Sequence, residues 1–86
     1  MNSITNPFKV TNYSELLDIL GIVLVADETV FININNDDCV LQCYKEFDDT
    51  YCIETIETNT YLTDNEFTFG SWSSMVEEIV NAYDLK

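Results

Sequence analysis

The side chains of this chain that could take part in chemistry are carboxylates and thiols, because the sequence contains no histidine. The commonest general base is therefore missing, and Ser-His-Asp and Cys-His arrangements are impossible. Pairs of carboxylates can act as acid and base, but sixteen acidic residues in a chain of 86 bring such pairs together by chance. The sequence also has no glycine-rich phosphate loop. We therefore expect a protein that is not an enzyme and that uses no cofactor.

The three cysteines, Cys39, Cys43 and Cys52, are the next candidates for chemistry. An odd number cannot form a complete set of disulfides, and three thiolates without a histidine do not match a usual closed zinc site. The polar run at 35–38 offers oxygen ligands, but it lacks the spaced acids, the glycine and the terminal glutamate of a calcium loop. We interpret the cysteines as small buried hydrophobic residues, and we predict no metal site.

Negative charge is the strongest signal in the sequence. The formal net charge is -13, from sixteen acidic residues and three lysines. Between Lys45 and Lys86 there are ten carboxylates and no basic residue. Self-repulsion of this size destabilises a compact chain, so its retention predicts a partner that carries positive charge. Three lysines and no arginine leave no basic footprint for direct binding of DNA or RNA.

Composition argues for one globular domain covering residues 1–86. Disorder is typical of acidic chains with few apolar residues, but here 47% of the residues are hydrophobic and 13% are aromatic. The longest apolar run, Ile22–Ala26, is far too short to span a bilayer, and no secretory signal is visible. We expect a cytoplasmic protein with reduced thiols and no membrane partner, placed in the host cytoplasm if a phage encodes it.

A helix is predicted near each end of the chain. Asn12 can cap the first helix, with Glu15 at the capping-box spacing, and Gly21 is expected to end it. Ser71 can cap the second helix after Gly70. The apolar face of the first helix is Tyr13, Leu16, Leu17 and Leu20, and that of the second is Trp72, Met75, Val76, Ile79, Val80 and Tyr83. Both spacings are those of an amphipathic helix.

The middle of the chain has the pattern of short strands joined by tight turns. The strand-like segments are Ile22–Ala26, Thr29–Asn35, Cys39–Phe47, Thr50–Thr58, Tyr61–Thr63 and Glu66–Phe69, and Phe8 with Val10 adds a short strand or packs onto the core. Turn residues stand at 35–38, 48–49 and 64–65. Hairpin-length loops favour antiparallel neighbours. The predicted fold class is α+β, with a single antiparallel sheet of three to five strands and both helices packed on one face.

The acidic residues of the predicted turns and strands form the candidate site. Asp37-Asp38 and Asp48-Asp49 stand at opposite ends of one predicted strand, and further acids lie on the following strands. Residues two apart on a strand are about 6.6–7 Å apart, which is near the gap between successive phosphates of a nucleic acid. The predicted partner-binding residues are Asp37, Asp38, Asp48, Asp49, Glu54, Glu57, Asp64 and Glu66.

A small chain without histidine, strongly acidic and of α+β pattern, resembles the nucleic-acid mimics made by phages and mobile elements. These include anti-restriction proteins and anti-CRISPR inhibitors. The similarity is greatest to anti-CRISPR proteins of about this length, and it spans the whole chain as size, charge and architecture. It implies stoichiometric inhibition of a basic nucleic-acid-binding protein, such as a CRISPR effector, by blocking the site that recognises target DNA.

Two other functions are compatible with the sequence. An immunity protein or antitoxin would use the same charge to neutralise a basic nuclease toxin, with steering by charge and a few aromatic anchors. The candidate anchors are Phe31, Tyr44, Tyr51 and Tyr61. A structural or phage-assembly module would carry the acidic residues incidentally. The chain is expected to be a monomer, or a homodimer paired through an edge strand.

Overall fold

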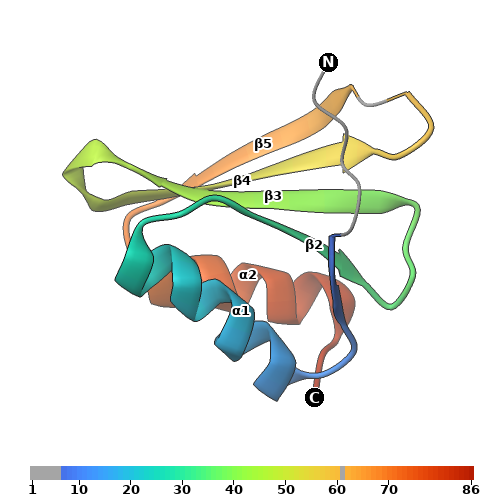
Figure 1. Cartoon of the computed structure of the whole chain (residues 1–86), viewed down its shortest axis with the longest axis horizontal. Coiled ribbons are helices and arrows are strands. Elements are labelled where there is room, and N and C mark those ends of the chain that lie inside the picture. The colour runs from blue at the N-terminus through green and yellow to red at the C-terminus, as the bar shows by residue number, and fades with distance from the viewer. Residues whose placement is uncertain (1–6, 61) are drawn as a thin grey trace.

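The computed structural model describes residues 7–60 and 62–86, apart from the side chain of Asp48. Within these residues the chain forms five strands, two α-helices and one short 3-10 helix (Figure 1). In chain order they are β1 (Phe8–Val10), α1 (Tyr13–Ala26), β2 (Val30–Ile34), β3 (Cys39–Glu46), η1 (Phe47–Asp49), β4 (Thr50–Glu57), β5 (Thr63–Phe69) and α2 (Trp72–Tyr83). The α+β class is confirmed.

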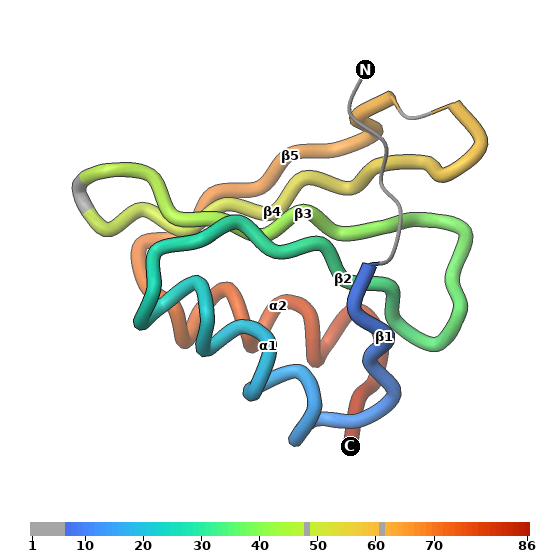
Figure 2. Tube along the Cα trace, in the orientation of Figure 1, coloured from blue at the N-terminus to red at the C-terminus, as the bar shows by residue number. Residues whose placement is uncertain are grey.

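The five strands form one mixed sheet in the order β1-β2-β3-β4-β5. β2 to β5 are antiparallel neighbours, but β1 pairs with β2 in parallel, with Phe8 opposite Ile32 and Val10 opposite Ile34. The prediction of a purely antiparallel sheet is therefore wrong. The reason is the connection, because α1 joins β1 to β2 and supplies the crossover that parallel strands need. Figure 2 shows β1 beside β2 at one edge of the sheet.

α1 is longer than the sequence pattern predicts. The expected strand Ile22–Ala26 is wrong, because these residues continue the helix. Gly21 lies inside α1 without a positive φ, and Asp27, at φ 56°, is the left-handed residue that ends it. A short apolar run fits a buried helix as well as a strand. Packing decides between the two here, since Val23 is fully buried in the core.

Both predicted helix caps are present. The Asn12 side chain accepts a hydrogen bond from the Glu15 N–H at 2.8 Å. In return Glu15 accepts from the hydroxyl of Thr11 at 2.7 Å and from its N–H at 2.8 Å. These bonds to Thr11 lower the pKa of Glu15, because they favour the charged carboxylate. At the start of α2, Ser71 accepts from the Ser74 N–H at 3.1 Å, which satisfies one of the free donors of the first turn.

The hairpins differ from the predicted pattern at two points. Phe47 was expected on the same side as Cys43, but β3 ends before it, and Phe47 begins η1 with 90% of its surface exposed. Asp64 and Asn65 were expected to form a turn, but both lie inside β5. Thr55 pairs with Asn65 and Ile56 pairs with Thr63. Asp64 is thus the extra residue of a bulge, which lets β5 continue through two residues that normally favour turns.

The apolar stripe of α2 packs as the sequence predicts. Met75, Val76 and Ile79 are buried, and Trp72, Val80 and Tyr83 are partly buried against the same core. The indole N–H of Trp72 also donates to the carbonyl of Leu20 in α1 at 2.9 Å. That hydrogen bond between segments far apart in the chain fixes where the two helices meet.

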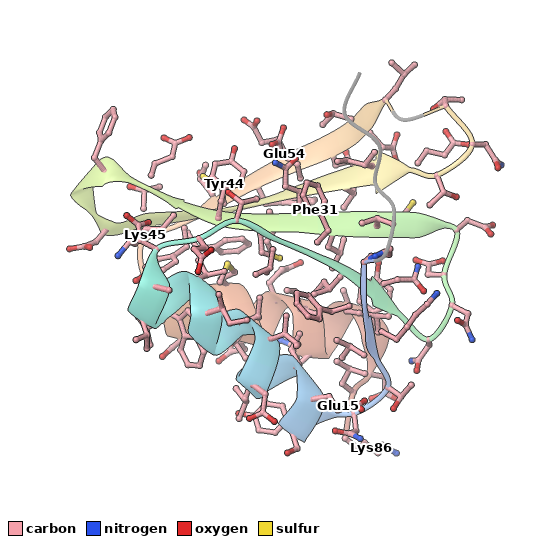
Figure 3. The ribbon with its side chains drawn as sticks, viewed as in Figure 1. Glu15, Phe31, Tyr44, Lys45, Glu54 and Lys86 are labelled. Carbon is pink, nitrogen blue, oxygen red and sulfur yellow. The ribbon has the colours of Figure 1, made fainter. Side chains whose placement is uncertain are left out.

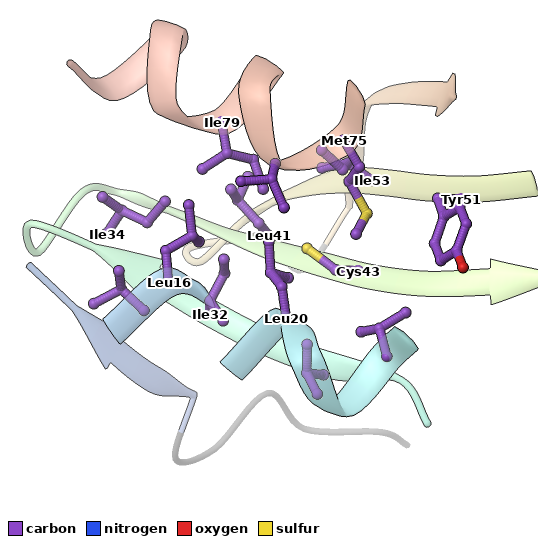
Figure 4. Close-up of a cluster of buried hydrophobic side chains, with 14 of the residues drawn as sticks. Leu16, Leu20, Ile32, Ile34, Leu41, Cys43, Tyr51, Ile53, Met75 and Ile79 are labelled. Atoms are coloured by element: carbon purple, nitrogen blue, oxygen red, sulfur yellow. The ribbon is translucent and has the colours of Figure 1, made fainter. Parts of the chain in front are cut away.

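Side chains from the sheet and from both helices share one hydrophobic core (Figure 4). In Figure 1 the helices lie side by side on one side of the sheet. The core includes Leu16 and Leu20 of α1, Ile32 and Ile34 of β2, Leu41 and Cys43 of β3, Tyr51 and Ile53 of β4, and Met75 and Ile79 of α2. The C-terminus returns to the start of α1, where the N–H of Tyr13 donates to the carbonyl of Lys86 at 3.0 Å. Neither helix of the described residues is both long and apolar enough to cross a membrane.

Candidate functional site

Four of the predicted carboxylates come together at one end of the sheet. They are Asp37 and Asp38 of the β2–β3 turn, Glu57 at the end of β4 and Asp64 in the bulge of β5, and we call them the turn cluster. The thiol of Cys39 lies close enough to all four carboxylates for their charges to affect its pKa. Burial raises the pKa of this thiol, and the negative charges of all four carboxylates raise it further. The fold therefore concentrates charge that is spread over almost thirty positions of the sequence.

The β2–β3 turn that carries Asp37 and Asp38 is held rigidly. Asn35 and Asn36 both adopt positive φ angles, of 53° and 58°, which asparagine tolerates better than most residues. The buried side chain of Asn33 donates to the carbonyl of Asp37 at 2.9 Å and to that of Cys39 at 3.2 Å. These bonds fix the backbone on both sides of Asp38.

Three further hydrogen bonds connect the turn cluster to the rest of the molecule. Thr58 donates through its N–H, at 3.1 Å, and through its hydroxyl, at 2.7 Å, to the carbonyl of Asp38. The hydroxyl of Tyr83, on the last turn of α2, donates to the carboxylate of Asp37 at 3.1 Å. Burial, together with this carboxylate, raises the pKa of Tyr83 to about 12. The tyrosine therefore remains a donor to Asp37 at neutral pH.

A second group of acids lies on the face of the sheet that points away from the helices in Figure 1, which we call the outer face. Side chains alternate between the two faces of a strand. Since Leu41, Cys43 and Ile53 belong to the core, the alternate residues of β3 and β4 point outward. The outer face thus carries Phe31, Val40, Gln42, Tyr44, Glu46, Cys52, Glu54, Ile56, Glu66 and Thr68.

Glu54 and Glu66 are directly opposite each other in the pairing of β4 with β5. Opposite residues on one face of an antiparallel pair have Cβ atoms about 4.5–5.5 Å apart, and like charges in such a pair destabilise the sheet. Glu46 adds a third carboxylate on the same face, and its side chain accepts a hydrogen bond from the thiol of Cys52 at 3.6 Å. We call Glu46, Glu54 and Glu66 the face cluster.

Glu46 is a member of the site that the sequence prediction missed. The signal was present, because Glu46 alternates in phase with Tyr44 and Gln42 on β3. The nearby thiol of Cys52 is affected by Glu46. Burial is the largest cause of its raised pKa, the charge of Glu46 is the next largest, and Glu66 has a smaller effect.

Aromatic side chains accompany the face cluster. Tyr44 lies opposite Cys52, and burial raises its pKa, with further contributions from Glu54 and Cys52. Figure 3 shows Phe31, Tyr44 and Glu54 on the outer face, while Lys45 points to the other side. Of the predicted anchors, Phe31 and Tyr44 are half-buried there. Tyr51 is wrong as an exposed anchor because it is buried in the core, and Tyr61 lies outside the described residues.

Apolar side chains fill the space between these groups. Val40 and Ile56 are opposite each other, and together with Cys52 they are at most 7% exposed, although they belong to the outer face and not to the core cluster. The outer face therefore combines buried apolar side chains with half-buried aromatic residues and carboxylates.

The remaining predicted site residues lie elsewhere. Asp49 is exposed at the tip of the β3–β4 hairpin, with φ 56°, and so it stands at the opposite end of β3 from the turn cluster. The side chain of Asp48 lies outside the described part of the structure. Acids outside the predicted site are also carried by the helices and their ends: Glu15, Asp18, Asp27, Glu28, Glu77, Glu78 and Asp84. Negative charge is therefore dense on the sheet but not confined to it.

The described residues contain no side-chain cluster arranged for metal binding. Among them, no group of three or more Cys, Asp or Glu side chains is arranged to hold a metal ion. The three cysteines are free thiols. Burial raises the pKa of Cys43 to about 12, so this thiol is held in its unreactive neutral form.

Comparison with known proteins adds no relative to this description. No family model, curated protein or solved structure matches the chain.

Proposed function

We propose that this protein is a non-catalytic inhibitor whose acidic sheet surface blocks the nucleic-acid-binding groove of a basic partner. The partner class is a CRISPR effector or a similar nucleoprotein, as the resemblance to anti-CRISPR proteins implies. In this proposal the two helices cover one face of the sheet and support it, and the outer face with the turn cluster meets the partner.

The observation that carries the proposal is the pairing of Glu54 with Glu66. Like charges directly opposite each other lower the stability of a sheet, and the chain has no nearby lysine in sequence to relieve them. A cationic groove would relieve this repulsion on binding. Arginine and lysine side chains that normally contact phosphates would then contact these carboxylates, and the association rate would rise through electrostatic steering.

The two clusters approach each other most closely on β5, where Asp64 of the turn cluster is two positions from Glu66 of the face cluster. On β4, Glu54 is opposite Glu66, whereas Glu57 is three positions further along and points to the other face of the strand. Alternate positions on a strand are about 6.6–7 Å apart, and neighbouring strands are about 4.7–4.9 Å apart. Carboxylates at these distances on a rigid sheet are spaced closely enough to compete with a phosphate backbone for the same cationic side chains.

The test is inhibition of DNA binding by purified CRISPR effector complexes, measured by mobility shift with increasing amounts of this protein. We expect stoichiometric inhibition that weakens as salt rises, because exposed charges are screened within about 8–10 Å at 0.1–0.15 M. The Glu54→Gln/Glu66→Gln variant should inhibit poorly. The Asp18→Asn/Glu77→Gln variant is the matched control, since it removes the same charge from the helices.

Two results would contradict the proposal. One is that no effector loses DNA binding at a molar excess of the protein. The other is that the sheet variant and the helix variant inhibit equally, because net charge alone would then explain the effect.

One observation favours the alternative of an immunity protein or antitoxin that neutralises a basic nuclease toxin. Phe47 is 90% exposed at the tip of the β3–β4 hairpin, beside Asp49. An exposed aromatic residue flanked by charge is typical of an anchor that fills a pocket of one cognate partner. Under this alternative, Phe47→Ala would abolish protection against the toxin, and added DNA would not displace the protein. Under the main proposal, Phe47→Ala would have a small effect and DNA would compete.

A further inference from the structure

We propose that the free edge of β5 binds an extended basic segment of the partner as an additional strand. The segment would alternate apolar side chains with lysine or arginine. This inference rests on the proposed function, because it names the part of a basic partner that the acidic sheet would recognise and the way in which it would be held.

β5 is the last strand of the sheet, at the edge opposite β1 (Figure 1). No strand pairs with its outer side within residues 7–60 and 62–86. Every residue of β5 is exposed except Phe69, which is half-buried. Exposed edges of this length are ready templates for pairing with another chain, and strand addition is a common way to bind an extended peptide.

Hydrogen bonding identifies which amides are available on this edge. The N–H of Asn65 points toward β4, because it donates to the hydroxyl oxygen of Thr55 at 3.0 Å. Successive N–H groups of a strand point to alternate sides, so the N–H groups of Glu66 and Thr68 point away from β4. These two amides, with the carbonyls of the same residues, form the ladder available to an added strand.

An apolar groove lies beside the edge on the helix side of the sheet. It has a volume of about 330 Å³ and is lined by Ile53 and Phe67 of the sheet and by Ile79, Ala82 and Glu78 of α2, among others. Phe67 is 42% exposed there, although it is a large aromatic residue. A strand paired with β5 would direct alternate side chains toward this groove, where apolar groups would cover Phe67.

The other set of side chains of the added strand would lie on the outer face. Glu66 is the nearest outward side chain of β5, and Glu54 lies behind it on β4. Lysine or arginine at these positions would meet both carboxylates. Charge therefore selects a basic occupant on one face, while the groove selects apolar residues on the other.

A second copy of this chain fits the edge poorly. Each copy carries a formal charge of -13, and pairing of two β5 strands would bring Asp64 and Glu66 of each copy close to those of the other. Like charges near one another across paired strands are destabilising. The edge is thus biased against self-association and toward a positively charged segment.

The experiment uses the full chain and a synthetic peptide in which lysine alternates with valine. Binding is followed by NMR titration and by amide hydrogen exchange. We expect slower exchange at the amides of Glu66 and Thr68 and chemical-shift changes at Phe67. Two control peptides separate the contributions: one replaces lysine with glutamate, and one keeps the side chains but carries N-methyl groups on the amides of one edge. Each control should bind at least about tenfold more weakly, which corresponds to about 1.4 kcal/mol.

Variants of the protein, in place of variants of the peptide, test the same edge. Thr68→Pro removes an N–H that points away from β4, and proline is tolerated in edge strands, so folding should survive and peptide binding should fall about tenfold. Thr68→Val keeps the N–H and should bind like the parent. If Thr68→Pro proves unfolded by circular dichroism, the N-methylated peptide still decides the question.

The outcomes distinguish this inference from the proposed function. Equal binding of the parent and N-methylated peptides would overturn strand addition but leave the acidic inhibitor intact, since its own test is the DNA-binding assay. Absence of any binding by the lysine–valine peptide at low salt would likewise overturn the inference. A homodimer by sedimentation that Thr68→Pro dissociates would assign the edge to a second copy and overturn it as well.

Discussion

The two faces of this sheet are built from alternate residues of the same strands, yet they differ in almost every physical property. On the helix side, Ile32, Cys43 and Ile53 belong to a core cluster that, among the described residues, consists of hydrophobic side chains. On the outer face, Phe31, Tyr44 and Glu54 are only half-buried, and like charges oppose each other across β4 and β5. The side chains on the helix side stabilise the fold, whereas the like-charged pair on the outer face lowers its stability.

The comparison shows where each kind of residue can be changed. A change on the helix side should act on folding and leave the binding of the folded protein alone. A change of a carboxylate on the outer face should act on binding and leave folding unchanged, or even improve it. Each of the following predictions separates these two effects, from the largest to the smallest.

The largest effect is expected from a neighbouring pair of residues on β2. Ile32 is fully buried, so Ile32→Ala should lower the free energy of unfolding by about 2–5 kcal/mol. Phe31, next to it in sequence, is half-buried on the outer face, so Phe31→Ala should cost clearly less. Urea denaturation of both variants measures the difference. Equal losses would mean that the outer face is a second structural core.

High pH should destabilise the protein through the buried thiol of Cys43 on the helix side. Cys43 has its pKa raised from 9.0 to about 12. Above pH 9 the unfolded thiol loses its proton while the folded one keeps it, so the unfolded state binds fewer protons and stability falls as pH rises. The expected loss is about 1.4 kcal/mol per pH unit until the folded thiol ionises. Cys43→Ala should remove this part of the slope, as denaturation at pH 8 to 11 would show.

The turn cluster should depend on Asn33. Its buried side chain holds the carbonyls of Asp37 and Cys39, so Asn33→Ala leaves two acceptors without this donor and should cost about 1–3 kcal/mol. Because the turn would loosen, amide exchange should speed up at Asp37 and Asp38 before it does in α1. Uniform acceleration across the chain would instead indicate that Asn33 stabilises the fold globally.

The smallest effect has the opposite sign. The Glu54→Gln/Glu66→Gln variant should be more stable than the parent, by a few tenths of a kcal/mol and at most about 1 kcal/mol, because a like-charged pair is removed. Moderate salt should raise the melting temperature of the parent more than that of the variant. The Asp18→Asn/Glu77→Gln variant corrects for the change in net charge. A variant less stable than the parent would contradict the view that the outer face gives up stability for binding.

Local signals in the sequence were sufficient for several elements. The caps at Asn12 and Ser71, the apolar stripe of α2 and the turn at 35–38 were predicted correctly, because each depends on residues within a few positions of one another. The end of α1 could not be predicted, since Ile22–Ala26 fits either a helix or a strand until it meets the core. The pairing of β1 and the bulge at Asp64 also needed partners distant in sequence.

The candidate site divides in the same way. Composition alone determined that the protein is acidic and lacks histidine, and the prediction of a cationic partner rests on it. The turn and strand patterns placed Asp37 in a turn and Glu54 on a strand. Only the tertiary structure decided that Glu54 faces Glu66, that Glu46 joins them, and that the turn cluster surrounds Cys39. The physical reason is register: a shift of one residue moves every side chain of a strand to the other face, and long-range packing, not local sequence, sets that register.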